Sequence, residues 1–229
     1  MEEEKQDNES EESRKEKLIK RYNIDLERLK REQLKIAREL EIKDKIDFSL
    51  ADSFGAVDNT FIDNKLLSCF IVCDKNFEIV DRSYAFEKVK FPYIPGFRNY
   101  RELPVMIEAF EKLSEKPDII FVPAQGIIHP RLGLASHFSL ATSVPTIGVS
   151  NAIVDCEVKG EDIVKDDNKV GKLLSVKPGS KPLFISPGNG ITIESAIKLS
   201  KKLVRLPHKR PEPLHLAAKY ARGVRKELS

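Results

Sequence analysis

The order of apolar and polar positions divides the chain into three parts. Residues 1–13 contain almost no apolar side chain, whereas residues 14–40 carry leucine, isoleucine and alanine at roughly helical spacing among many charges. Further along, short apolar runs of strand length alternate with stretches of helical spacing. We therefore expect a disordered acidic tail over 1–13, an N-terminal helical segment over 14–44 and a folded domain over 45–229.

The predicted domain begins with consecutive strands and continues with strands and helices in alternation. A short apolar stretch ends at Asp58, and two strand-like runs follow it with turn residues between them, as in an antiparallel meander. Such an order is typical of a single-domain α/β fold with a mixed sheet flanked by helices. The predicted strands are 66–74, 78–89, 118–122, 146–150, 172–176 and 182–186, and the predicted helices begin near Arg101 and Pro130 and cover 193–204 and 213–226.

The composition fits a soluble globular protein, with 41% hydrophobic and 33% charged residues in a chain of 229. The sequence has no run of about eighteen apolar residues, the length that a membrane-spanning helix needs. Its acidic N-terminus differs from the basic and then apolar start of a signal peptide, which favours a cytoplasmic location. Cys69, Cys73 and Cys156 lack the paired spacing of a zinc site, so we expect a reducing compartment, with Cys69 and Cys73 as buried thiols because they lie in an apolar run.

Charge is distributed unevenly along the chain. Residues 1–13 have a net charge of −6, which leaves +9 on the remaining residues because the whole chain carries +3. A basic folded part is compatible with a phosphate backbone as partner. The acidic tail is a solvating extension or the contact for a protein partner that the sequence does not identify.

Two acidic residues are candidates for a metal site. Phosphodiester hydrolysis usually relies on Mg²⁺ bound by carboxylates near strand ends, since the ion activates water and stabilises charge on phosphate oxygens. Asp58 is expected at the end of the first strand, and Glu102 is expected at the start of a helix. Glu102 also suits an ordinary role as an acid in the first helical turn, which the helix dipole favours.

Five motifs occur in order along most of the chain. Together they resemble the endonuclease V family, and the resemblance extends from about residue 33 to the C-terminus. It implies an RNase H-like fold and Mg²⁺-dependent cleavage one nucleotide 3′ of deoxyinosine in DNA or inosine in RNA. The motifs are FPYIPGFRNYRELP, QGIIHPRLGLASH, VPTIGVS, PLFISPGN and RLPHKRPEPLHLA.

The resemblance also implies roles for individual residues. The family's catalytic, metal-binding aspartate and glutamate match Asp58 and Glu102. Glycines in a base pocket make physical sense, because a flipped base approaches the main chain closely. The wedge loop, which fills the gap left by a flipped base, matches Pro92, Tyr93, Ile94 and Pro95; the base pocket matches Gly96, Gln125, Gly126 and Gly148; and His129, Pro130 and Arg131 match a further motif.

The chain departs from the family pattern at several polar positions. Pro123 and Ala124 stand where the family has aspartate and glycine, Asn151 where it has lysine, and Asn189 where it has histidine. Two carboxylates therefore remain of a cluster that needs about three acids and a histidine, and losing groups that act together commonly costs about 10³-fold or more in rate. Asp155 and Glu194 are candidates for replacement ligands.

Three interpretations follow from these departures. The first is a nucleic-acid-binding member of the family, with DNA or RNA as partner, whose cleavage is weakened or lost. The second is an active endonuclease whose Mg²⁺ site is rebuilt around Asp58 and Glu102. The third is a protein-interaction subunit without catalysis, which uses the acidic tail and the 14–40 helices. Mg²⁺ is the expected cofactor of an active enzyme, and no cofactor is expected otherwise.

Overall fold

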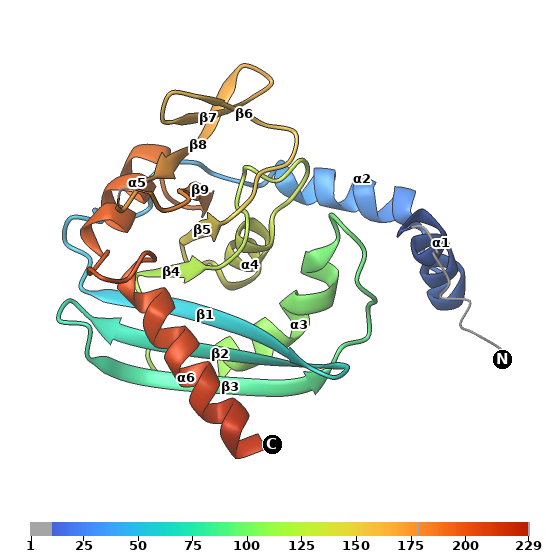
Figure 1. The fold of residues 1–229 in the computed structure, drawn as a ribbon, viewed down its shortest axis with the longest axis horizontal. Helices are drawn as coiled ribbons and strands as arrows, with labels where there is room; N and C mark the ends of the chain where they lie inside the picture. Colours follow the sequence, from blue (N-terminus) through green and yellow to red (C-terminus); the bar gives the residue numbers. More distant parts are fainter. Residues whose placement is uncertain (1–10, 178, 229) are drawn as a thin grey trace, which may run out of the picture.

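A mixed sheet runs through the part of the chain that the computed structural model describes, residues 11–177 and 179–228 (Figure 1). The described residues form nine strands in the order β3-β2-β1-β4-β5-β9-β8-β7-β6. The prediction of a single-domain α/β fold with a mixed sheet flanked by helices is confirmed. The elements are α1 (Glu11–Tyr22), α2 (Leu26–Ala37), β1 (Ser53–Ile62), β2 (Lys65–Asp74), β3 (Ile79–Lys88), α3 (Arg98–Glu111), β4 (Ile119–Val122), α4 (Leu134–Thr142), β5 (Thr146–Ser150), β6 (Glu157–Lys159), β7 (Asp162–Lys165), β8 (Asn168–Leu174), β9 (Leu183–Asn189), α5 (Ile193–Lys202) and α6 (Glu212–Leu228).

The strands β1, β2 and β3 form the predicted antiparallel meander. A tight turn joins β1 to β2, and Asp63 in this turn adopts the left-handed conformation with φ of 52°. Asp58 pairs with Cys69 in the middle of β1. The predicted strand end at Asp58 is wrong, because Phe61 and Ile62 still pair with β2 beyond it.

The second half of the sheet places two more strand ends beside β1. β4 runs parallel to β1, and β5 runs parallel to β4, so the carboxyl ends of all three strands point the same way. β9 lies antiparallel to β5 and continues through Pro187 to Asn189, past the predicted end at 186. The strands β6, β7 and β8 form an arm at the top of Figure 1. Sequence analysis did not predict β6 and β7, because both strands are short and rich in charged residues, and all three residues of β6 are exposed.

Two apolar cores lie on opposite faces of the sheet. One contains Val57 of β1 with apolar side chains of α3 and α4, and an aromatic cluster of Phe70, Phe110 and Phe138 lies at its centre. The other contains Phe54 and Ala56 of β1 with side chains of α5 and α6. Successive residues of a strand point to opposite faces, so β1 separates the two cores.

The N-terminal segment forms the helices α1 and α2, which extend to one side of the sheet (Figure 1). The side chain of Asp25 caps α2 by accepting a hydrogen bond from the Arg28 amide at 2.9 Å. Residues 11–13, which the sequence pattern assigned to the tail, form the first turn of α1. Residues 1–10 of that predicted tail lie outside the described residues.

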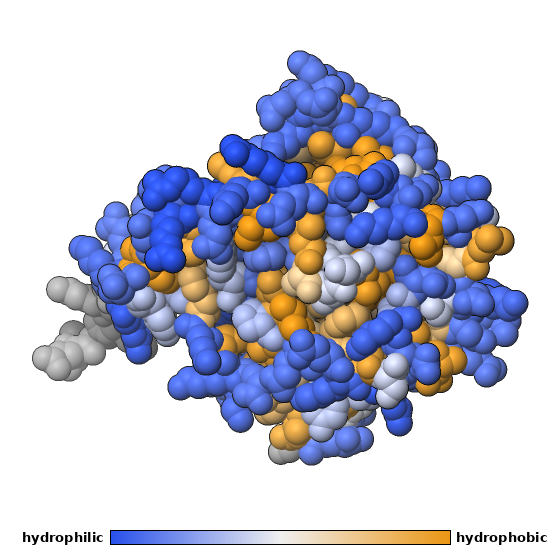
Figure 2. Space-filling view, turned by 180° about the vertical axis from the view of Figure 1, so that it is seen from behind, coloured by the Kyte–Doolittle hydropathy of each residue, from blue (hydrophilic) through white to orange (hydrophobic). Residues whose placement is uncertain are grey.

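The prediction that Cys69 and Cys73 are buried thiols is confirmed. Cys69 and Cys73 are fully buried, and burial raises the pKa of each thiol to about 12. Cys156 is only partly buried, and all three thiols are free. Among the described residues, none of the helices combines the length and apolar character needed to cross a membrane. On the face shown in Figure 2, hydrophilic side chains predominate and smaller apolar areas interrupt them.

Candidate functional site

A cavity of about 640 Å³ opens at the carboxyl ends of β4 and β5. Its walls come from the loop before α3, the loop between β4 and α4, and the segment that follows β5. The structure brings together at this cavity eight of the residues that the family resemblance selected. They are Tyr93, Ile94, Pro95, Gly96, Gln125, His129, Pro130 and Arg131.

The wedge loop at 92–95 has one buried and one exposed large side chain. Ile94 is 1% exposed and anchors the loop in the domain, whereas Tyr93 is 63% exposed. The guanidinium carbon of Arg101 lies 5.9 Å from the centre of the Tyr93 ring. An aromatic ring held at the rim of a cavity in this way presents a free face on which a base can stack.

A hydrogen-bonded network attaches the wedge loop to α2. The carbonyl oxygen of Gly96 accepts from Gln33 Nε2 at 3.1 Å and from Arg131 Nη2 at 3.0 Å. Arg131 Nε also donates to Gln33 Oε1 at 2.6 Å, and Gln33 Nε2 donates to Asn99 Oδ1 at 3.1 Å. Sequence reasoning missed Gln33, which is fully buried. The sequence signal that could have identified Gln33 is its position, because it is a polar residue among the apolar residues on one face of the predicted N-terminal helix.

Gly126 and Gly148 support the cavity from behind rather than lining it. A Cβ atom on Gly126 would clash with the carbonyl oxygen of Pro187 in β9. A Cβ atom on Gly148 would lie 2.5 Å from the Gly126 nitrogen and 2.7 Å from the Ala124 oxygen. These glycines let the chain after β4 pack directly on β5 and β9. Gly96 does line the cavity, and its φ of 80° favours glycine.

His129 holds the turn that follows Gly126. Its Nδ1 atom accepts hydrogen bonds from the backbone amides of Arg131 and Leu132, each at 3.1 Å. Burial lowers the pKa of His129 to about 4, and the positive charges of Arg131 and Lys165 contribute to this shift. His129 is therefore a neutral imidazole at neutral pH, and one of its nitrogens is already used as an acceptor.

Glu102 is bound to Arg98 one turn earlier in α3. Arg98 donates from Nε to Glu102 Oε1 at 2.5 Å and from Nη2 to Glu102 Oε2 at 2.9 Å. Asn59 Nδ2 donates to the same Oε2 at 2.8 Å, and the Glu102 side chain is only 5% exposed. Both carboxylate oxygens thus have close donors. Sequence reasoning missed Arg98 because an Arg–Glu pair four residues apart is common on helices.

Asp58 lies on the other face of β1. It shares the face of Phe54 and Ala56, which belong to the core beneath α5 and α6, whereas Asn59 faces α3 and Glu102. Its carboxylate accepts a hydrogen bond from Thr60 Oγ1 at 3.1 Å. Within the described part of the chain, no third histidine, cysteine, aspartate or glutamate gathers with Asp58 and Glu102 as a metal-binding group would require.

Pro123 follows β4, where the family resemblance calls for an aspartate. Its carbonyl oxygen accepts a hydrogen bond from Arg98 Nη1 at 3.2 Å, so the guanidinium of Arg98 spans Glu102 and the end of β4. Mg²⁺ prefers oxygen ligands and keeps most of its waters when protein ligands are few. A guanidinium bound to one of the two remaining carboxylates repels a cation, so these residues do not fit the Mg²⁺ site that the family implies.

The other substituted positions separate in space. Ala124 and Asn151 line the cavity, together with Asp155. Asn189 lies elsewhere: it pairs with Thr146 at the start of β5, and its Oδ1 accepts from the Glu41 amide at 2.7 Å. Glu194 does not line the cavity, and Lys169 binds its carboxylate at 3.0 Å. Of the two candidate replacement ligands, only Asp155 is at the cavity.

Sequence comparison relates the chain to one family over most of its length. The family model described as Endonuclease V matches residues 34–219. "Endonuclease V" of Thermosipho melanesiensis is 33% identical over 225 residues, which cover 93% of this chain and 94% of that protein. "Endonuclease V" of Archaeoglobus fulgidus is 33% identical over 213 residues, which cover 90% of this chain and 96% of that protein.

Solved structures of endonuclease V share the fold. The Streptomyces avermitilis protein superposes with a TM-score of 0.80 at 26% identity and covers 88% of this chain and 93% of its own. The catalytic domain of human endonuclease V gives 0.80 at 24% identity, with 89% and 97% covered. The Ciona intestinalis protein, in complex with a 24mer DNA containing an inosine followed by a ribo-adenosine, gives 0.81 at 21% identity, with 89% and 99% covered. The RNase H-like fold that the resemblance implied is confirmed, and this chain belongs to the endonuclease V family.

Proposed function

We propose that this chain binds nucleic acid, including inosine-containing strands, at the cavity beside β4 and β5, and that its cleavage activity is weakened or lost. The observation that carries the second part is the bidentate binding of Glu102 by Arg98. On this proposal, the chain retains the nucleic-acid-binding surface of a nuclease, and its metal-dependent cleavage is weakened or lost.

The cavity suits a flipped nucleotide in charge and shape. Arg131 and Arg210 line it against the single carboxylate of Asp155, and the charge of Arg98 is offset by Glu102, so the field of the cavity favours a phosphate backbone. The exposed ring of Tyr93 stands at the rim, where stacking on an aromatic side chain is worth about 1–3 kcal/mol per base. Support also comes from the Ciona relative, whose structure holds inosine-containing DNA on the same fold.

The carboxylate site argues against efficient hydrolysis. Asp58 and Glu102 occupy opposite faces of β1, Glu102 is neutralised by Arg98, and Pro123 brings no ligand atom except its carbonyl oxygen. Binding Mg²⁺ there would require Arg98 to leave Glu102 and would still leave too few acids. When bound, the ion would supply an activated water and charge stabilisation; among the described residues, no group of three histidine, cysteine, aspartate or glutamate side chains includes Asp58 or Glu102.

One gel experiment tests both parts of the proposal. Inosine-containing and plain strands of DNA and of RNA are incubated with the protein, in Mg²⁺ or Mn²⁺, beside an Asp58→Ala variant. We expect binding that favours inosine and no cleavage above background. Robust cleavage that disappears in Asp58→Ala would contradict the loss of activity and favour a rebuilt metal site. Absence of both binding preference and cleavage would contradict the recognition role and favour a protein-interaction subunit.

A further inference from the structure

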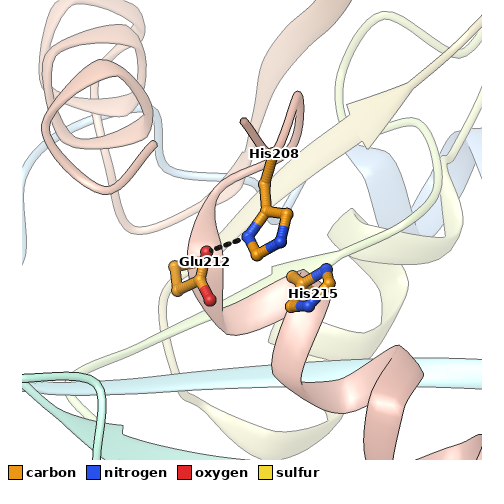
Figure 3. Close-up of side chains that lie close together, drawn as sticks. All are labelled: His208, Glu212 and His215. Atoms are coloured by element: carbon orange, nitrogen blue, oxygen red, sulfur yellow. Dashed lines mark hydrogen bonds and ion pairs between the residues drawn. The ribbon is translucent and has the colours of Figure 1, made fainter. Parts of the chain in front are cut away.

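Two histidines and a glutamate gather at the start of α6, outside the cavity described above (Figure 3). His208 lies in the segment before α6, whereas Glu212 and His215 lie in its first two turns. Each side chain offers one ligand atom, and the three atoms lie within 4.8 Å of one another. Within the described residues, this is the one such group of three histidine, cysteine, aspartate or glutamate side chains.

We propose that His208, Glu212 and His215 bind a divalent transition-metal ion of the Zn²⁺ type. The site is separate from the carboxylates of Asp58 and Glu102 and does not depend on the nucleic-acid role. Two imidazoles and one carboxylate are a ligand set that Zn²⁺ accepts, and they leave one coordination position open for water or another ligand. Mg²⁺ is a poor competitor, because it prefers oxygen ligands.

The geometry is close to what the ion requires. Zn–N and Zn–O bonds of about 2.0–2.2 Å in a tetrahedron place the ligand atoms roughly 3.3 Å apart. His208 Nδ1 and Glu212 Oε2 already lie 2.7 Å apart, and the two imidazole rings stack with centroids 3.5 Å apart and planes inclined by 16°. Closing the site therefore needs ring rotations and small shifts of the His208 segment, because Glu212 and His215 share one helical face at a spacing of three residues.

The surroundings allow an ion to enter. The side chain of His208 is 35% exposed and that of Glu212 is 12% exposed, so the pair lies at the surface but is partly shielded from water. The Glu212 carboxylate offsets part of the cation's charge. Arg210, two residues after His208, lines the large cavity, so a bound ion would also restrain a segment that borders it.

Metal binding to the untagged full-length protein tests this site. Zn²⁺ is titrated by calorimetry with Mg²⁺ as the comparison ion, and Co²⁺ is added as a spectroscopic probe. We expect one Zn²⁺ per chain, no comparable response to Mg²⁺, and Co²⁺ absorption as intense as that of four- or five-coordinate sites. His208→Gln and His215→Gln should each weaken Zn²⁺ binding by at least about tenfold, because each substitution removes one imidazole ligand of the ion.

Two controls separate this site from other metal-binding groups. Cys156→Ser, which removes the partly exposed thiol, should bind Zn²⁺ as the unmodified protein does. Circular dichroism without metal establishes that each histidine variant is folded. Undiminished Zn²⁺ binding by the doubly substituted protein would overturn the proposal, as would an octahedral Co²⁺ spectrum in the unmodified protein; the latter measurement decides the question even where a variant fails to fold.

Discussion

The guanidinium of Arg98 binds both carboxylate oxygens of Glu102, at 2.5 and 2.9 Å, and also donates to the Pro123 carbonyl at 3.2 Å. One side chain thus connects the remaining glutamate of the expected metal site with the residue that replaces its missing aspartate. Charge-assisted bidentate pairs of this kind are among the stronger hydrogen bonds in proteins. The carboxylate of Glu102 therefore has a structural role in this chain. Its loss should change the free energy of unfolding.

We expect Glu102→Gln to lower the free energy of unfolding by about 1–3 kcal/mol. The substitution leaves the Arg98 charge partly buried without its counter-ion, while the Asn59 amide keeps an acceptor. In a working metal site the opposite result is typical, because clustered catalytic acids repel one another and their removal stabilises the fold. Urea unfolding of the two proteins gives the comparison.

Asp58→Asn is the matched control for Glu102→Gln. Thr60 Oγ1 can donate to an amide oxygen as well as to a carboxylate, so we expect a change in unfolding free energy within about 0.5 kcal/mol. A stabilising effect of Glu102→Gln would contradict the structural role assigned to that carboxylate.

Restoring the lost acid should restore cleavage only when Arg98 is also removed. In Pro123→Asp alone, the new carboxylate lies beside Arg98 and becomes a second partner for its guanidinium. In the double variant Arg98→Leu/Pro123→Asp, the Glu102 carboxylate and the introduced carboxylate are both free to bind a cation. We expect the double variant to cut inosine-containing strands in Mg²⁺ or Mn²⁺, at a rate at least about tenfold above either single variant.

Adding Glu102→Ala to the double variant is the control, and it should abolish the restored cleavage. An active Pro123→Asp single variant would show that Arg98 does not block the site. An inactive but folded double variant would indicate that further groups are missing.

Much of the fold follows from the sequence. Alternating and helical apolar patterns predicted the meander, the strands β4 and β5 and the helices, because an element buried on one face has apolar residues at regular spacing. Asp58 was placed at a strand end because polar residues follow it, yet pairing with β2 continues to Ile62. The strands β6 and β7 have only three and four residues, half or more of them charged, so they show no such apolar pattern.

The site was predicted as a set of positions but not as a set of contacts. Motif order selected Tyr93, Gly96, Gln125 and His129, and the fold brings them to one cavity. The bond from Arg98 to Glu102 depends on rotamers, and the contact of Gln33 with Gly96 joins residues 63 apart in sequence. The distinction between lining a cavity and supporting it, which separates Gly96 from Gly126, likewise requires coordinates.

Tyr93 should contribute to binding without contributing to stability. Its ring is 63% exposed, so Tyr93→Ala removes little buried surface. Losing a stacked base should weaken binding to single strands by about 1–3 kcal/mol, roughly 5- to 150-fold. Tyr93→Phe keeps the stacking face and should bind within about twofold of the unmodified protein. Fluorescence anisotropy measures both; equal losses in the two variants would contradict stacking as the cause.

Acidification should destabilise the fold through His129. Its pKa is lowered from 6.5 to about 4 by burial, so between these values the unfolded chain takes up a proton that the folded chain excludes. Stability is therefore present above pH 6.5 and is lost as the pH falls toward 4, by an amount on the order of 3 kcal/mol.

The variant His129→Asn isolates this contribution. The asparagine oxygen can accept from the same backbone amides but does not titrate, so the stability of the variant should fall less between pH 6.5 and 4. Burial also lowers the pKa of His137 and His215, and their effect remains in both proteins. Parallel pH profiles of unfolding free energy for the two proteins would contradict the assignment to His129.

Two glycines that differ in their surroundings should respond oppositely to alanine. A methyl group on Gly126 would clash with the carbonyl oxygen of Pro187, which is held in place by the strand β9. We expect Gly126→Ala to destabilise the protein by about 1–3 kcal/mol and to weaken nucleic-acid binding, because the wall of the cavity would have to move.

Gly223 is the matched control. It lies in α6 with no atom within 4 Å of the added carbon, so Gly223→Ala should stabilise the protein by about 0.5–1 kcal/mol. Thermal and urea unfolding measure both changes. Tolerance of alanine at 126 would mean that the strand contacts behind the cavity are looser than the packing of Gly126 and Gly148 indicates.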